Sequence, residues 1–151
     1  MCKGPNVPGN FAIVQEGFDA LCPGSKRQND TTNAWFIRKP GPGETVCKGF
    51  LIWNGREMQA DAIPTGYAVV GEEVSPACAK SNYSKAPANA WRIKLPGYQE
   101  TVCKGFPLPR GYVVRGETVT AACPSKSGGK NAWVIARKIY IERRTLYPLD
   151  P

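Results

Sequence analysis

The sequence predicts an all-β fold built from three similar, disulfide-containing segments of about 50 residues each. Three observations lead to this expectation. One pattern of residues occurs three times along the chain, and such repetition is the signature of an architecture made of similar units. Glycine and proline number 16 and 14 among 151 residues, and both disfavour helix interiors. No window shows the 3.6-residue apolar spacing of an amphipathic helix.

The repeated pattern begins with Cys-Lys-Gly and continues through a glutamate and a second cysteine to Asn-Ala-Trp. The opening cysteines are Cys2, Cys47 and Cys103, and the second cysteines are Cys22, Cys78 and Cys123. The Asn-Ala-Trp triplets occupy residues 33–35, 89–91 and 131–133. We divide the chain into segments 2–46, 47–102 and 103–151. Because Thr-Val runs directly into Cys-Lys-Gly twice, we expect these boundaries to lie within strands.

Short β-branched and aromatic runs recur in each segment at the same place. They occupy residues 11–14, 67–70 and 112–115, and alternating apolar residues follow each Asn-Ala-Trp triplet. This predicts about four short strands per segment. Two arrangements fit: one β-trefoil-like domain with a shared core, or three tandem mini-sheets, each held by its own disulfide. The second is plausible because a unit of this size usually needs such a cross-link.

Six cysteines in a short chain rich in glycine and proline indicate disulfides and an oxidising compartment. We therefore expect an extracellular or periplasmic, secreted protein. Two pairing schemes respect the repetition. The first is Cys2–Cys22, Cys47–Cys78 and Cys103–Cys123. The second is Cys22–Cys47, Cys78–Cys103 and Cys123–Cys2. We favour the first, because the second requires the two ends of the array to meet.

The composition argues against an enzyme. The absence of histidine excludes Ser-His, Cys-His and histidine-zinc chemistry, and the cysteine spacings do not match a zinc site. We expect no cofactor, no metal and, without an apolar run of 18 residues, no transmembrane segment. A two-carboxylate hydrolase is the enzymatic alternative. Its candidate carboxylates are Asp19, Glu57, Asp61 and Glu73.

The second segment differs from the others by an insertion. Its cysteines are 31 residues apart, against 20 in the other two segments. Asn54-Gly55 between β-compatible runs is a strong signal for a two-residue turn, since both turn positions require positive φ. The sequence therefore predicts a protruding hairpin over residues 51–61. Its tip residues Trp53, Asn54 and Arg56 are candidate partner-binding residues, because Trp and Arg are enriched at binding hot spots.

The net charge of +8 is concentrated in the last segment. Segments 2–46 and 47–102 each carry +1, whereas 103–151 carries +6 and includes a basic C-terminal tail. The candidate binding residues here are Arg137, Lys138, Arg143 and Arg144. A basic surface attracts anionic polysaccharide, membrane or nucleic acid through salt-sensitive contacts. We consider nucleic acid unlikely, because no nucleic-acid-binding module is recognisable.

Residues shared by the three segments are interpreted as scaffold. The tryptophans are expected in the core, Lys3, Lys48 and Lys104 on a solvated face, and the shared glutamates in turns. Asn29 and Asn82 lie in N-glycosylation sequons that matter only in a eukaryotic secreted protein.

These observations favour a secreted, non-enzymatic binding module for a cell-surface glycan or another anionic envelope component. Two alternatives remain. One is a self-assembling extracellular filament or appendage subunit, in which the hairpin inserts into a neighbouring copy. The other is a rigid protein inhibitor, in which the hairpin enters the cleft of a target.

Overall fold

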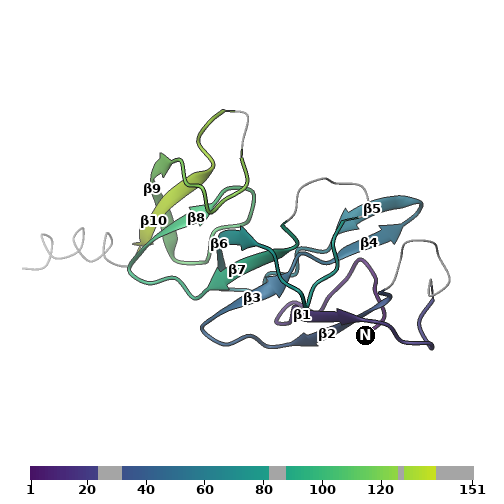
Figure 1. Cartoon of the computed structure of the whole chain (residues 1–151). Coiled ribbons are helices and arrows are strands. Elements are labelled where there is room, and N and C mark those ends of the chain that lie inside the picture. The colour runs from purple at the N-terminus through teal and green to yellow at the C-terminus, as the bar shows by residue number, and fades with distance from the viewer. Residues whose placement is uncertain (24–31, 82–87, 126–127, 139–151) are drawn as a thin grey trace, which may run out of the picture.

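Among the residues described, the protein forms ten β-strands in four small sheets and no helix longer than a turn (Figure 1). The structure is a computed structural model that describes residues 1–23, 32–81, 88–125 and 128–138. The all-β prediction is therefore confirmed. No helix within these ranges is long and apolar enough to cross a membrane.

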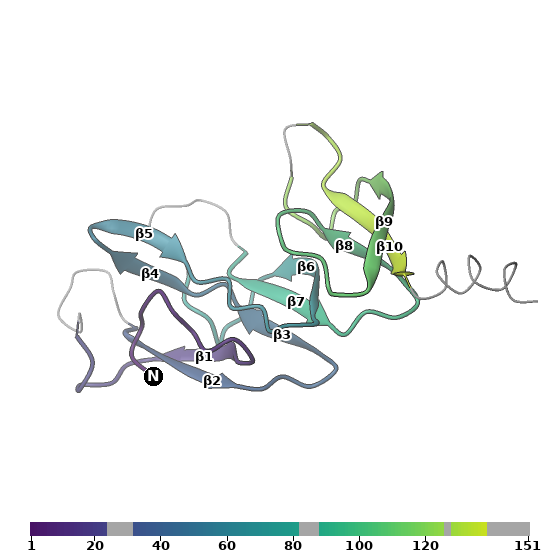
Figure 2. The same ribbon diagram turned by 180° about the vertical axis from the view of Figure 1, so that it is seen from behind.

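The first sheet is a pair of antiparallel strands, β1 (Ala12–Gly17) and β2 (Ala34–Arg38). A second two-stranded sheet is the hairpin of β4 (Phe50–Trp53) and β5 (Arg56–Gln59). Both lie at one end of the molecule, opposite the strands nearest the C-terminus (Figures 1 and 2).

The other two sheets have three strands each, in the same order. In one, β7 (Ala90–Lys94) lies between β3 (Gly43–Cys47) and β6 (Ala68–Glu73). In the other, β10 (Ala132–Arg137) lies between β8 (Gln99–Cys103) and β9 (Tyr112–Thr118). All pairings are antiparallel.

The strands β3 and β8 cross the boundaries drawn from the sequence. β3 pairs Val46 with Trp91, and β8 pairs Val102 with Trp133, so each joins the sheet of the segment that follows it. Both boundaries drawn from the sequence therefore lie inside a strand. This explains why no linker composition marks the junctions.

The three disulfides join Cys2 to Cys22, Cys47 to Cys78 and Cys103 to Cys123. This is the first of the two schemes considered above. Each bond ties the opening cysteine of a segment to the loop that follows its glutamate-bearing strand.

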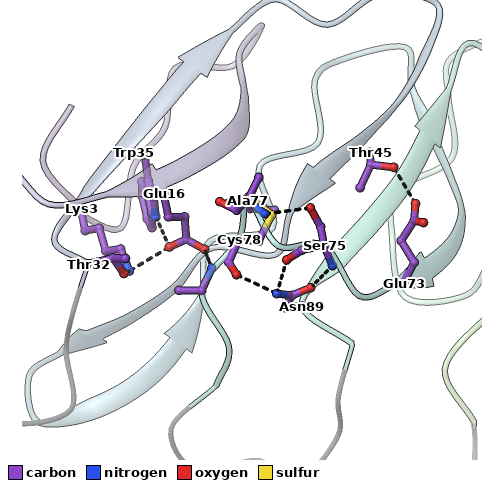
Figure 3. Close-up of a disulfide and its surroundings, with 12 residues drawn as sticks. Lys3, Glu16, Thr32, Trp35, Thr45, Glu73, Ser75, Ala77, Cys78 and Asn89 are labelled. Atoms are coloured by element: carbon purple, nitrogen blue, oxygen red, sulfur yellow. Dashed lines mark hydrogen bonds and ion pairs between the residues drawn. A yellow bond between two sulfur atoms is a disulfide. The ribbon is translucent and has the colours of Figure 1, made fainter.

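A buried asparagine holds each of these cysteine loops against the sheet. Asn89, 1 % exposed, donates to the carbonyls of Ser75 and Cys78 at 2.9 and 2.8 Å and accepts from the Ser75 N–H at 2.7 Å (Figure 3). Asn33 and Asn131 make the equivalent three bonds. Satisfying buried backbone groups in this way explains why an amide side chain precedes every Ala-Trp.

The tryptophans and isoleucines that follow these asparagines form much of the core. Trp35 and Trp91 are 1 % and 5 % exposed, and Trp133 is half-buried. Ile93 and Ile135 are also buried, on the same strands. Three clusters of buried residues are spread along the molecule, and each includes residues from neighbouring sheets.

Candidate functional site

The predicted insertion folds as a hairpin with an exposed tip. Asn54 and Gly55 have φ values of 52° and 77°, as a two-residue turn of this hand requires. Trp53 pairs with Arg56 across the ladder, and residues 53–56 are all exposed. The indole of Trp53 has 44 % of its surface exposed, so an amphipathic ring and a guanidinium stand side by side at the tip.

The base of the hairpin belongs to the core. Leu51 is 5 % exposed and packs in a cluster with Ile13 and Trp35. Asp61 accepts a hydrogen bond from the Trp91 indole at 2.8 Å. Deleting the whole insertion would therefore damage the fold, and substitutions confined to residues 53–56 are the appropriate probes of the tip.

A basic region occupies one end of the sheet formed by β8, β10 and β9. Arg110 precedes β9, and Arg137 and Lys138 end β10; all three are exposed. They lie together because Arg137 pairs with Tyr112, and the Lys138 N–H donates to the Gly111 carbonyl. We call Arg110, Arg137 and Lys138 the basic end.

Few carboxylates balance this charge. Among the described residues from 103 to 138, Glu117 is the sole acidic residue, against six lysines and arginines. Glu117 pairs with Lys104, at the strand end opposite the basic end. The Lys104 ammonium, through its hydrogen bond and its charge, lowers the pKa of the Glu117 carboxyl below its ordinary value of 4.5. The described residues of this segment therefore carry a net charge of +5, from six lysines and arginines against one glutamate.

The hairpin tip and the basic end lie at opposite ends of the molecule (Figures 1 and 2). The structure therefore does not bring the sequence-predicted binding residues into one site. Trp53, Asn54 and Arg56 belong to one region, and Arg137 and Lys138 to the other. Arg143 and Arg144, like the sequons at Asn29 and Asn82, fall outside the described residues.

The lysines and glutamates shared by the three segments form ion pairs that the sequence did not predict. Lys3 contacts Glu16 at 2.8 Å with side chains only 9 % and 1 % exposed, and Lys48 contacts Glu72 at 2.8 Å (Figure 3 shows the first pair). The solvated-face interpretation is therefore wrong for Lys3 and Lys48. The expectation that the glutamates lie in turns is also wrong, because all three are in strands.

The tryptophans complete these ion-pair sites. The Lys48 ammonium lies 4.2 Å from the centroid of the Trp91 ring, a cation–π distance. The Trp35 indole N–H donates to Glu16 at 3.0 Å. The co-occurrence of Lys, Glu and Trp in every segment was the available sequence signal. Their charges satisfy one another, so this arrangement is structural rather than a site for an anionic ligand.

The four candidate carboxylates of a hydrolase each form a hydrogen bond with a nearby group of the protein. Glu57 bonds to Ser81, Asp61 to Trp91, Glu73 to Thr45, and Asp19 to the Leu21 N–H. Glu16 lies near Cys47 and Cys78, but these sulfurs are joined in a disulfide and cannot act as thiolate metal ligands.

An open hollow of about 480 Å³ lies over β3 and β7. Its charged lining residues include Glu44, Lys94 and Glu100. Lys94 pairs with Glu100 at 2.7 Å, and Glu44 pairs with Arg38 at 2.6 Å. Arg92 also lines the hollow and belongs to neither pair, so the two ion pairs leave at most one positive charge in excess there.

Comparison with protein-family models, with curated proteins and with solved structures yields no match to this chain. The function is therefore inferred from the hairpin tip and the basic end.

Proposed function

We propose that the protein is a secreted, non-enzymatic binding module that recognises an anionic polysaccharide of a cell surface. The observation that carries the proposal is the basic end, where Arg110, Arg137 and Lys138 are exposed with one carboxylate in the whole described part of the last segment. Three disulfides are consistent with an extracellular protein.

The architecture suits a long polymer better than a small ligand. We propose that the sheets are three tandem units, with the basic end on the last unit and the hairpin tip on the second. A polysaccharide contacting the basic end would gain affinity if its chain also reached the Trp53 indole. Aromatic rings supply large contact area at small conformational cost, and arginine binds sulfate or carboxylate groups in bidentate geometry.

The experiment measures binding of heparin, used as a generic sulfated polysaccharide, by calorimetry at one fixed ionic strength. The variant Arg110→Gln/Arg137→Gln removes two positive charges from the basic end. Its matched control, Lys39→Gln/Lys80→Gln, removes two exposed charges elsewhere. We expect at least about tenfold weaker binding for the arginine variant and nearly wild-type binding for the lysine variant. Equal losses of heparin affinity in the two variants would show that binding depends on net charge alone and would contradict a site at the basic end.

A second pair of variants tests the hairpin. Trp53→Ala should weaken binding of heparin chains long enough to reach from the basic end to the hairpin tip, and leave binding of short oligosaccharides unchanged. Met58→Ala, on the same hairpin and 39 % exposed, is the control. If Trp53→Ala has no effect at any chain length, the hairpin is not part of this binding surface.

A further inference from the structure

The face of β1 and β2 is covered by the segment that follows it. Ile13 and Trp35 are 0 % and 1 % exposed. They share a buried cluster with residues of the next segment, namely Cys47, Cys78 and Ala90. The Glu16 N–H also donates to the Ala77 carbonyl at 2.9 Å. A disulfide, the alanine of Asn-Ala-Trp and a loop carbonyl thus cover the strand face.

The next junction uses the sequence-equivalent positions. Val69 and Trp91, 1 % and 5 % exposed, share a buried cluster with Cys103, Cys123 and Ala132. The Glu72 N–H donates to the Ala122 carbonyl at 2.8 Å. Two successive junctions therefore bury the same kind of strand face against the same kind of disulfide face.

In the last segment the same strand face is more exposed than it is at the two internal junctions. Val114 holds the place of Ile13 and Val69 but is 44 % exposed, and Trp133 is half-buried. The exposure of the shared glutamate side chain rises along the chain, from 1 % for Glu16 through 21 % for Glu72 to 49 % for Glu117.

The first segment presents the opposite, disulfide face. Cys2 is exposed and Ala34 half-buried, whereas the equivalent Cys47 and Ala90 are both 0 % exposed. Leu21, at the place of Ala77 and Ala122, is 91 % exposed. The two ends of the described chain therefore carry the two halves of an interface that it forms internally twice.

We propose that the partner of these faces is a second copy of this chain, joined head to tail. Val114 and Trp133 of one copy would pack on the Cys2–Cys22 disulfide and Ala34 of the next. The Glu117 N–H would donate to the Leu21 carbonyl of that copy, as Glu16 and Glu72 do within the chain. Pro5 stands in sequence where Phe106 contacts Trp91 edge-on at 5.0 Å, so it would meet Trp133.

The contact is heterologous, because the two faces are different surfaces. Each added copy presents a fresh strand face, so association continues instead of closing on a dimer unless the rotation per copy forms a ring. The surface consists of Val114 and Trp133 at one end and the Cys2–Cys22 disulfide at the other, and does not include Arg110, Arg137 or Lys138. A failure to associate would therefore not by itself remove the proposal of polysaccharide binding.

The test is sedimentation velocity of the full chain over a wide range of concentrations. Wild type should form dimers and higher species. Val114→Asp and Leu21→Asp place a carboxylate in one face each, and both residues are exposed enough for the fold to tolerate the change. Each should weaken association at least tenfold. Val119→Asp is the matched control: Val119 is 64 % exposed, and its equivalents Phe18 and Val74 are exposed at both internal junctions.

Mixing the two variants identifies the head-to-tail geometry. Leu21→Asp keeps its strand face and Val114→Asp keeps its disulfide face, so an equimolar mixture should form a one-to-one dimer that grows no further. A wild type that stays monomeric at the highest concentration would overturn the proposal. So would a mixture that stays monomeric while wild type associates, or association that appears only after residues 139–151 are removed.

Discussion

Replacing Asn89 with alanine tests how the cysteine loops are held. The side chain is 1 % exposed and makes three hydrogen bonds to the backbone of Ser75 and Cys78. Alanine leaves one N–H and two carbonyls without this partner, and each lost bond of this kind costs about 1 kcal/mol. We expect a loss of about 3 kcal/mol in the free energy of unfolding, a large share of the 5–15 kcal/mol typical of whole domains.

The assay is urea denaturation with the disulfides intact, followed by tryptophan fluorescence. The midpoint should fall while the slope stays constant, because the surface exposed on unfolding hardly changes. Asn10→Ala, at an exposed position, is the control and should shift stability by less than about 0.5 kcal/mol. A loss below about 1 kcal/mol for Asn89→Ala would refute the anchoring role.

Two further predictions concern the backbone and pH. Gly49 and Gly55 have φ values of 80° and 77°, but a Cβ at Gly49 would lie 2.7 Å from Ile13 Cδ1, whereas nothing lies within 4 Å at Gly55. In thermal melts, the free energy of unfolding should therefore fall by about 1 kcal/mol for Gly55→Ala and by at least about 2 kcal/mol for Gly49→Ala. Equal losses of stability would contradict the close approach of Gly49 to Ile13. Because Lys104 lowers the pKa of Glu117, the ionised carboxylate stabilises the fold at neutral pH, and this contribution disappears as the pH falls through the lowered pKa. The stability difference between wild type and Glu117→Gln should thus be present at pH 7 and vanish at strongly acid pH; a difference independent of pH would contradict the ion pair.

Local signals predicted the fold class and the hairpin well. Asn54-Gly55 determines its turn through backbone conformation alone. Pairing of the cysteines within segments was favoured because the other scheme requires the two ends of the array to meet. These features depend on residues near one another or on repetition, so they are visible in one sequence.

The burial and pairing of the shared lysines could not be predicted from local sequence signals. Lys48 and Glu72 are 24 residues apart. They meet because Lys48 directly follows β3, which belongs to the same sheet as β6, the strand of Glu72. Nothing in the local pattern around Lys48 distinguishes a buried, paired lysine from a solvated one. The burial of Glu16 likewise depends on the next segment, through its bond with the Ala79 N–H at 2.7 Å.

Which candidate residues lie near one another could not be predicted from the sequence either. Trp53 and Arg137 were both candidate binding residues, because each belongs to a feature that breaks the repetition. Their separation follows from the order of the sheets along the molecule, which is set by the junctions at Ile13 and Val69. Both residues remain exposed, but each belongs to a different end.

The salt dependence of heparin binding tests the proposed function most directly. For wild type, the logarithm of the affinity should fall linearly with the logarithm of the salt concentration, since each arginine contact releases a condensed counterion. Removing two contacts in Arg110→Gln/Arg137→Gln should make that slope shallower by roughly 1.5 to 2. The control Lys39→Gln/Lys80→Gln should keep the wild-type slope. An unchanged slope in the arginine variant, or no binding by wild type at low salt, would contradict recognition of an anionic polysaccharide at the basic end.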